Sequence, residues 1–201
     1  SSPSVTVNMS SPVTAIILAG GTSRRMGAVN KLLMEWRGQP VICHVAQTAV
    51  ASRAGRTIVV TGYDNDAISN ALEGIDVKIV HNRYFEDGLS TSLVAGITAL
   101  DEQTAGAAIL LADMPMLHAD TLNALIDAFV DARGRMICVP VCQGRRGNPV
   151  LWPRSCFSDI LQLSGDRGAR DLMTTFKDQV YEVSCTDEGV LRDFDSPDDI
   201  T

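Results

Sequence analysis

Residues 107–112 form an uninterrupted apolar run, Ala-Ala-Ile-Leu-Leu-Ala, which ends abruptly at Asp113-Met114-Pro115. The run is too short for a typical helix and therefore predicts a strand over residues 107–113. A strand that is apolar at every position must be covered on both faces, as strands are in parallel sheets with helices on both sides. This segment therefore favours an α/β architecture.

The chain before residue 135 alternates between similar strands and amphipathic helices. Apolar, β-branched segments predict further strands at residues 14–19, 56–62 and 77–81. Helical spacing of apolar residues predicts helices from about residue 40, over 64–72, from Ser90-Thr91-Ser92 onward and over 119–132. This alternation predicts an α/β fold with a Rossmann-like, doubly wound and mostly parallel sheet. Ligands bind such sheets at the carboxyl ends of the strands.

A different pattern is expected in the C-terminal part. Strands are predicted at residues 136–142 and 148–152, and the Gln-Gly-Arg-Arg-Gly segment between them is short enough for an antiparallel hairpin. A helix near residues 166–176 and a strand at 180–185 complete the predicted elements. The mostly parallel sheet should therefore carry an antiparallel hairpin near its C-terminal end.

The length of 201 residues suits one α/β domain rather than two. Residues 1–12 are polar and rich in Ser, and they lack the basic start and apolar centre of a signal peptide, so we expect a disordered leader followed by a single domain over 13–201. No apolar run approaches the ~18 residues of a membrane span. We therefore expect a soluble, cytoplasmic protein without a membrane partner.

The overall charge argues against a nucleic-acid partner. The formal net charge is -7 and the sequence pI is about 4.9, whereas nucleic-acid binding by counterion release requires clustered excess positive charge. A small-molecule ligand is the better expectation. Within this acidic chain the cations Arg24, Arg25 and Lys31 stand close together.

The five cysteines are an odd set that lies mostly in apolar segments. This pattern is typical of small core residues in a reducing compartment. Cys138 and Cys142 are separated by three residues, but no second Cys or His pair is placed to complete a zinc site. The three histidines share no ligand spacing, and no arrangement of Ser-His-Asp or Cys-His type can be argued from the sequence.

Residues 14–31 combine a buried strand with a phosphate-binding type of loop. The strand breaks at Gly20-Gly21, where positive φ is available and the amides are uncovered. Hydroxyls of Thr22 and Ser23 follow, together with the three cations. A donor-rich loop with clustered positive charge at a strand end suits a polyphosphate. The loop matches neither the Walker pattern nor the dinucleotide-binding fingerprint.

Carboxylates follow the apolar strand and recur near the end of the chain. Asp113 stands directly after the strand, at the sheet edge where the ligand crevice should open. Such a carboxylate can hold Mg²⁺ together with substrate phosphates, although an Asp that caps the turn before Pro115 is the structural alternative. Asp193 and Asp195 are candidates for a second metal ligand, with a solvated surface turn as the alternative.

Arginines in two glycine-containing segments are candidates for binding phosphate or carboxylate groups. Their guanidinium groups can form bidentate contacts. The simpler interpretation is that they are exposed loop residues. They are Arg145, Arg146, Arg167 and Arg170.

At this point the motifs resemble a known family. Residues 18–31, Leu-Ala-Gly-Gly-Thr-Ser-Arg-Arg-Met-Gly-Ala-Val-Asn-Lys, are similar to the signature loop of the molybdopterin guanylyl- and cytidylyltransferases, which attach a nucleotide to the molybdenum cofactor. The similarity extends through Gly-Leu-Ser-Thr-Ser-Leu, Leu-Ala-Asp-Met-Pro, Gly-Asn-Pro-Val-Leu, Gly-Asp-Arg-Gly-Ala-Arg and Asp-Ser-Pro-Asp-Asp, and so covers nearly everything after residue 13. The first motif alone is shared with sugar-nucleotide pyrophosphorylases.

The resemblance implies a sheet like that of the nucleotide-diphospho-sugar transferases and a set of site residues. Catalytic roles fall to Lys31, Arg24 and Asp113, and the metal ligands of Mg²⁺ would be Asp113 and Asp195. The nucleotide-binding residues would be Leu18, Ala19, Gly20, Gly21, Thr22, Ser23, Arg25, Met26 and Gly27. The acceptor-binding residues would be Ser90, Thr91, Ser92, Asn148, Arg167 and Arg170.

The implied reaction is attack of the terminal phosphate of molybdopterin on the α-phosphate of a nucleoside triphosphate, with release of pyrophosphate. Gly20 favours GTP, because family members with Gly there use GTP and a missing methyl group leaves room beside a purine. The longer motifs around residues 145–152 and 165–170 resemble the cytidylyl branch more closely, so CTP is preferred and GTP is the alternative.

Two alternative hypotheses assign a different acceptor or a different class of protein. One is a nucleotidyltransferase that acts on a sugar phosphate. Another is a non-catalytic protein that binds a nucleotide or cofactor and hands it on, although the presence of Lys31, Asp113 and Asp195 together favours an enzyme. A recipient molybdoenzyme or its chaperone is the expected protein partner.

Overall fold

The computed structural model describes residues 11–21 and 30–194. Residues 1–10 of the predicted leader, part of the glycine loop and the last seven residues lie outside these ranges. The described part of the leader is bonded to the fold, since the carbonyl of Pro12 accepts a hydrogen bond of 2.8 Å from the N–H of Ala105. The folded chain therefore begins at least as early as Pro12.

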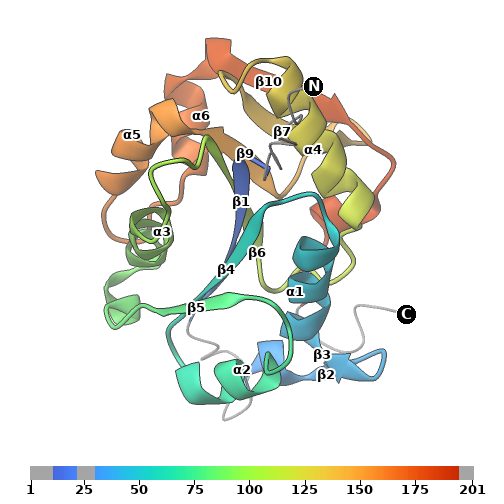
Figure 1. The fold of residues 1–201 in the computed structure, drawn as a ribbon, viewed down its shortest axis with the longest axis vertical. Helices are drawn as coiled ribbons and strands as arrows, with labels where there is room; N and C mark the ends of the chain where they lie inside the picture. The colour runs from blue at the N-terminus through green and yellow to red at the C-terminus, as the bar shows by residue number, and fades with distance from the viewer. Residues whose placement is uncertain (1–10, 22–29, 195–201) are drawn as a thin grey trace, which may run out of the picture.

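The centre of the molecule is a mixed sheet in the order β10-β7-β9-β6-β1-β4-β5 (Figure 1). Six of these strands are mutually parallel, and only β9 runs in the opposite direction between β6 and β7. The main strands are β1 (Val13–Ala19), β4 (Arg56–Thr61), β5 (Lys78–His81), β6 (Gly106–Leu111), β7 (Ile137–Cys142), β9 (Val150–Pro153) and β10 (Val180–Ser184). The carboxyl ends of the parallel strands thus meet at one edge of the sheet.

Helices cover both faces of this sheet, as the fully apolar strands require. They are α1 (Val41–Ala51), α2 (Asn65–Ala71), α3 (Leu89–Thr98), α4 (Ala119–Asp131), α5 (Phe157–Leu161) and α6 (Arg170–Thr175). Figure 1 shows α1 and α4 on one side of the sheet and α3, α5 and α6 on the other. The predicted α/β, doubly wound and mostly parallel architecture is confirmed.

Alternation along the strands divides the core into two layers. On β1, Ala15 and Ile17 point towards α1 and α4, whereas Ile16 points towards α3. Both sets are at most 1% exposed. Each large aliphatic side chain that is buried in this way contributes about 1.5–3 kcal/mol. Both faces of β1 are therefore packed in the core, and this packing fixes the position from which the residues after β1 leave the sheet.

The predicted C-terminal hairpin is only partly correct. β7 and β9 are antiparallel neighbours, but the tight turn at Gln143-Gly144 connects β7 to the short strand β8 (Arg145–Arg146) instead. Both turn residues have positive φ, 53° and 74°, which matches a two-residue hairpin turn. β9 then enters the sheet between β6 and β7. Its N-terminal end consequently lies at the same sheet edge as the ends of the parallel strands.

A second small hairpin was missed by the sequence analysis. It joins β2 (Glu35–Trp36) to β3 (Gln39–Pro40) through Arg37 and Gly38, which both have positive φ. The strands are two residues long, too short for any periodicity to indicate them. The segment lies between the short 3-10 helix Lys31–Leu33 and α1.

Candidate active site

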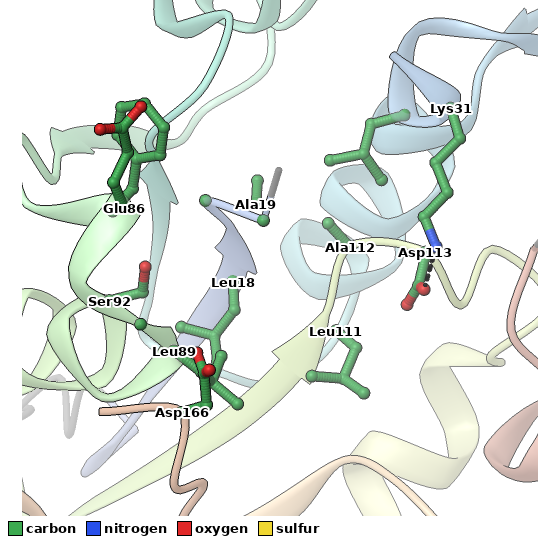
Figure 2. Close-up of a pocket in the computed structure, with 15 residues that line it drawn as sticks. Leu18, Ala19, Lys31, Glu86, Leu89, Ser92, Leu111, Ala112, Asp113 and Asp166 are labelled. Carbon is green, nitrogen blue, oxygen red and sulfur yellow. Dashed lines mark hydrogen bonds and ion pairs between the residues drawn. The ribbon is translucent and has the colours of Figure 1, made fainter. Parts of the chain in front are cut away.

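A cavity of about 550 Å³ opens at the carboxyl ends of β1 and β6 (Figure 2). These strands are direct neighbours, and their last pair in register is Leu18 with Leu111. The chain leaves β1 into Gly20 and Gly21 and leaves β6 into Ala112 and Asp113. All six of these residues line the cavity. The site therefore lies where the doubly wound topology predicts it.

Lys31 and Asp113 form an ion pair at one side of this cavity. The distance from Nζ to Oδ2 is 2.9 Å, and the side chains are 26% and 21% exposed. Lys31 begins a 3-10 helix whose cap is the buried Asn30, since its Oδ1 accepts a hydrogen bond of 3.0 Å from the N–H of Leu32. The capped 3-10 turn therefore positions the backbone of Lys31, and the carboxylate of Asp113 positions its ammonium group.

The C-terminal segment is hydrogen-bonded to the backbone of Asp113. The N–H of Phe194 donates a hydrogen bond of 2.6 Å to the carbonyl of Asp113, and the Phe194 side chain is fully buried. Further back, Asp187 accepts hydrogen bonds from the N–H of His118 at 3.0 Å and from the hydroxyl of Thr121 at 2.7 Å. The segment from residue 185 to 194 is therefore fastened to the start of α4 and then to Asp113. Asp195, the predicted second metal ligand, follows directly but lies outside the described residues.

Asp113 has the donor chemistry of a magnesium ligand. Its carboxylate lies in the cavity, and Lys31 binds one of its two oxygens. Mg²⁺ prefers oxygen donors and takes one or two carboxylates together with substrate phosphates and water. Within the described ranges, no group of three or more His, Cys, Asp or Glu side chains is arranged for a metal ion. Among the described residues, Asp113 is thus the carboxylate that this cavity offers to a cation beside Lys31.

The start of α3 forms the other side of the cavity. The hydroxyl and the N–H of Ser90 both donate to the carbonyl of Gly165, at 2.7 and 3.1 Å. Gly88, with φ of 116°, lies so close to Gly165 that a side chain at position 88 would overlap the backbone there. These contacts join α3 to the loop that carries Asp166, and both segments line the cavity.

Two of the predicted acceptor residues, Ser90 and Thr91, form part of this framework. The hydroxyl of Thr91 donates to the carbonyls of Gly88 at 2.7 Å and Tyr84 at 3.0 Å, so it caps the chain locally, as the Ser90 hydroxyl does at Gly165. Ser92 differs because it lines the cavity while being only 3% exposed. Of the predicted Ser90–Ser92 triplet, Ser92 is the residue that the structure brings to the cavity.

Gly20 fits against Ser92. A Cβ atom built on Gly20 would lie 2.6 Å from Ser92 Oγ, whereas the same atom on Gly21 would meet nothing within 4 Å. Neither glycine has a positive φ, so the expectation that Gly20-Gly21 breaks the strand by such a conformation is wrong. Gly20 is instead required by a close approach between the end of β1 and α3.

A smaller, mostly apolar cavity of about 170 Å³ adjoins the first, and the two share Leu18, Leu89 and Leu111. Asn148 and Arg170 line it, as does the fully buried Trp152. Arg170 donates a hydrogen bond of 2.8 Å to the carbonyl of Gly147, which holds its guanidinium beside the start of β9. Two of the predicted acceptor residues therefore lie together next to the main cavity.

The other candidate arginines are surface residues. Arg167 is 64% exposed and pairs with Asp171 at 3.5 Å. Arg146 pairs with Glu182 at 3.1 Å, and Arg145 is exposed beside it on β8. Neither cavity is lined by these three arginines.

The structure thus gathers one group of predicted residues and leaves another undescribed. Seven of the predicted residues line the main cavity: Leu18, Ala19, Gly20, Gly21, Lys31, Ser92 and Asp113. The residues outside the described ranges are Thr22, Ser23, Arg24, Arg25, Met26, Gly27 and Asp195. Cavity residues that the sequence analysis missed are Leu32, Phe85, Glu86, Gly88, Leu89, Leu111, Ala112 and Asp166. Five of them, Gly88, Leu89, Leu111, Ala112 and Asp166, lie within the motifs that carry the family resemblance, and Leu32 directly follows the first motif. Their place in these motifs was the available signal.

All five cysteines are free, and most of them are buried core residues, as predicted. Cys43, Cys138, Cys142 and Cys156 are buried, and Cys185 is partly exposed. Burial raises the pKa of the Cys138 thiol to about 11 and also raises the pKa values of Cys43, Cys156 and Cys185. Thiols with raised pKa values are poor nucleophiles at neutral pH.

Comparison with known proteins gives consistent matches along the chain. A family described as the MobA-like NTP transferase domain matches residues 15–180. The purine catabolism protein PucB of Bacillus subtilis (strain 168) is 29% identical, over 95% of this chain and 96% of its own length. The molybdenum cofactor cytidylyltransferase of Escherichia coli (strain K12) is 27% identical, over 94% of both chains.

Solved structures share the fold. The homologue of Mycobacterium tuberculosis Rv0371c from Mycobacterium sp. strain JC1 is 26% identical, with a TM-score of 0.77 over 87% of this chain and 86% of that one. Rv0371c of M. tuberculosis H37Rv in complex with manganese is 24% identical, with a TM-score of 0.71 over 86% and 88% of the two chains.

Among the helices that the structure describes, none has the length and apolar character to cross a membrane.

Proposed function

Because this chain belongs to the MobA-like NTP transferase family, we propose that it transfers CMP from CTP to the terminal phosphate of molybdopterin in the presence of Mg²⁺ and releases pyrophosphate. Membership of this family makes the chain a nucleotidyltransferase, in agreement with its similarity to the molybdenum cofactor cytidylyltransferase of E. coli. The choice of nucleotide, metal and acceptor is the proposal.

The observation that carries the proposal is the Lys31–Asp113 pair at the carboxyl ends of β1 and β6. A cation and a carboxylate 2.9 Å apart in a cavity bordered by Gly20 and Gly21 suit a nucleoside triphosphate with its metal ion. Lys31 is a fixed positive charge for phosphoryl oxygens, and Asp113 offers oxygen ligands. The pair therefore marks the phosphate end of the proposed site.

In the proposed reaction an oxygen of the acceptor phosphate attacks the α-phosphorus of CTP in line. A new bond forms between this oxygen and the α-phosphorus, the bond from the α-phosphorus to the bridging oxygen breaks, and pyrophosphate leaves. A phosphate monoester is already ionised near neutral pH, so no general base is required. Lys31 stabilises the charge that develops on the phosphoryl oxygens, and the site acts by positioning and electrostatics.

Asp113 would hold the magnesium ion, with Asp195 proposed as the second ligand. The N–H of Phe194 donates to the carbonyl of Asp113, so the residue that precedes Asp195 is bonded to the first ligand. When bound, the ion would neutralise charge on the triphosphate and on the leaving pyrophosphate. Magnesium is preferred because carboxylate and phosphate oxygens are its usual ligands in proteins.

The acceptor is proposed to lie on the side of Arg170 and Asn148. These residues line the smaller cavity, which adjoins the main cavity through shared leucines. Its wall is mostly apolar, with the guanidinium of Arg170 at its edge, which suits a planar ring system that carries a phosphate. The similarity to the molybdenum cofactor cytidylyltransferase of E. coli supports molybdopterin as the acceptor and CTP as the donor. We place the reaction in the cytoplasm, with a recipient molybdoenzyme or its chaperone as the protein that takes the product.

A side-by-side assay tests the proposal. Purified protein is supplied with Mg²⁺, molybdenum-loaded molybdopterin and CTP, GTP or ATP in separate reactions, and pyrophosphate release is measured. We expect turnover with CTP to exceed turnover with GTP by at least about tenfold, the discrimination that one well-placed contact gives. Faster turnover with GTP would reassign the nucleotide. Turnover with a sugar 1-phosphate and none with molybdopterin would reassign the acceptor.

A further inference from the structure

Cys142 and Cys185 lie opposite each other at the ends of two neighbouring parallel strands. The register of β10 on β7 ends with Ser184 opposite Val141. The N–H of Cys185 continues this ladder by donating a hydrogen bond of 2.9 Å to the carbonyl of Val141. The next pair in the register is therefore Cys185 with Cys142. Figure 1 shows β10 beside β7 at the edge of the sheet.

The two thiols also face the same layer of the core. Side chains alternate between the two faces of a sheet along each strand, so residues that are paired in register share a face. Cys142 is 2% exposed in the layer of α1 and α4, and Cys185 packs against that same layer. Burial is the main reason that the pKa of the Cys185 thiol is raised, and the neighbouring Cys142 thiol also raises it.

The spacing of the strands suits a disulfide bond. Neighbouring strands in a sheet lie about 4.7–4.9 Å apart, and a disulfide joins Cα atoms that are roughly 4.4–6.8 Å apart. Both thiols are free in the structure. The other cysteine of β7, Cys138, has Tyr181 opposite it in the register. Of the two cysteines on β7, Cys142 is thus the one with a thiol across from it.

Cys185 is also the first residue of the C-terminal segment, residues 185–194, which reaches the candidate site. The carboxylate of Asp187 joins this segment to α4, since it accepts a hydrogen bond of 2.7 Å from the hydroxyl of Thr121. At the far end, the N–H of Phe194 donates to the carbonyl of Asp113. A covalent bond at Cys185 would fix the start of the segment whose other end is bonded to Asp113.

We propose that Cys142 and Cys185 form a reversible disulfide bond, which fastens the start of the C-terminal segment to β7, with a low-molecular-weight disulfide as the oxidant. The inference is independent of the proposed function, because the thiol pair lines neither the main cavity nor the smaller one. It makes the C-terminal segment the part of this molecule that responds to an oxidising environment.

The partly exposed Cys185 reacts first. Its thiolate attacks one sulfur of the small disulfide, the sulfur–sulfur bond of the reagent breaks, and the first small thiol leaves with the proton that Cys185 released. The thiolate of Cys142 then attacks Sγ of Cys185 and displaces the second small thiol in the same way. The protein has lost two protons and two electrons, and the reagent has been reduced to two thiols.

Incubation of the full chain with oxidised glutathione under native conditions tests the inference. The reaction is run at about pH 8.5, because the raised pKa of Cys185 makes its thiolate scarce at neutral pH. Free thiols are counted, and mass spectrometry of non-reduced peptides identifies the linked residues. We expect two of the five free thiols to be lost, Cys142 to be linked to Cys185, and dithiothreitol to restore all five.

Three variants separate the two steps of the exchange. Cys185→Ser should lose no thiol, because its four remaining cysteines are buried. Cys142→Ala should retain one glutathione on Cys185 as a mixed disulfide, since the thiol that displaces it is gone. Cys138→Ala is the matched control, because position 138 lies on the same strand and in the same layer, and it should form the bond as the wild type does.

Hydrogen exchange measures the fastening of the C-terminal segment. The N–H of Phe194 is bonded to Asp113, so its exchange reports opening of this segment. We expect amide exchange over residues 186–194 to be at least about threefold slower in the oxidised protein than in the reduced protein, because the bond suppresses openings that begin at the end of β10. Cys185→Ser treated with the same reagent should show no change.

Glutathione that stays on Cys185 of the wild type, a bond between a different pair of cysteines, or no loss of thiols would each overturn the inference. A bond between Cys142 and Cys185 that leaves exchange over residues 186–194 unchanged would overturn the proposed fastening. If Cys142→Ala does not fold, peptide mapping of the wild type and of Cys185→Ser decides the question, because neither measurement needs that variant.

Discussion

Lys31 and Asp113 are 82 residues apart in the sequence, yet their side chains form an ion pair of 2.9 Å. The lysine follows the glycine loop after β1, and the aspartate follows β6, the strand that pairs with β1 in register. Adjacent parallel strands bring the segments after their carboxyl ends together. The topology of the sheet, rather than any local motif, therefore brings together the two residues that are proposed to bind the phosphates.

The first prediction concerns this pair. Asp113→Asn and Lys31→Met should each lower kcat by at least about 100-fold, because each removes charge that is needed where negative charge develops in the transition state. The double variant should be little worse than the worse single variant, since the two groups act as a unit. Steady-state pyrophosphate release measures kcat, and thermal unfolding of each variant controls for loss of structure. Multiplicative losses in the double variant would show that the residues act independently.

A second prediction concerns Asp195. Phe194 is bonded to the carbonyl of Asp113, and a carboxylate in the next residue is proposed to share the metal ion. Asp195→Asn should therefore raise the Mg²⁺ concentration needed for half-maximal activity by roughly tenfold, since a carboxylate binds the cation more strongly than an amide. A magnesium titration of activity is the measurement. Asp193→Asn gives the matched comparison two residues earlier and should change the magnesium requirement less.

The fold could be predicted because its strands are fully apolar and short. The strand at residues 107–113 and the helix at 119–132 are observed within one or two residues of their expected bounds, as β6 and α4. Such elements are determined by burial in the core, and the apolar residues that this burial requires are visible in the sequence. The connection of β7 to β9 was harder to predict. The turn after β7 leads into the two-residue strand β8, which pairs with β7 through only two residue pairs, and the sequence carries no pattern that distinguishes this from a direct hairpin to β9.

The site could be predicted only as far as strand ends and motifs indicate it. Asp113 was identifiable because a charged residue follows six apolar ones. Gly20 was identifiable as a glycine of the loop. The requirement for glycine at this position comes from the Ser92 hydroxyl, 72 positions along the chain, and so depends on the packing of α3 against β1. Arg167 and Arg170 looked equivalent in the sequence, and only the start of α6 places one at a cavity and the other in solvent.

A third prediction follows from this difference between the two arginines. Arg170→Ala should raise the KM for the acceptor about tenfold and leave the KM for the nucleotide nearly unchanged, because Arg170 lines the smaller cavity and a lost charged hydrogen bond is worth roughly 1.5–3 kcal/mol. Arg167→Ala should have a smaller effect on the same constant, since Arg167 is 64% exposed and pairs with Asp171. Initial rates at varied acceptor concentration distinguish the two. A larger effect from Arg167→Ala would move the acceptor to the outer face of this loop.

The last prediction concerns stability at high pH. Cys138 is fully buried on β7, and burial raises the pKa of its thiol from 9.0 to about 11. Between these values the unfolded chain releases the proton and the native chain keeps it, so the free energy of unfolding falls as pH rises from 9 through about 11. Two pH units correspond to at most about 2.7 kcal/mol, at 1.36 kcal/mol per unit.

Urea unfolding of the wild type and of Cys138→Ala at several pH values isolates this contribution. Lysines and tyrosines also titrate in this range, but they do so in both proteins, and the difference between the two curves reports Cys138 alone. The alanine variant is expected to be less stable below pH 9, because it leaves a small cavity, and to lose less stability above it. Cys138→Val, which fills the space differently, should show a different stability at pH 8 and the same shallower dependence on pH. A variant that keeps the full wild-type pH dependence would assign the loss to other groups, because neither Ala nor Val at position 138 has a proton to release.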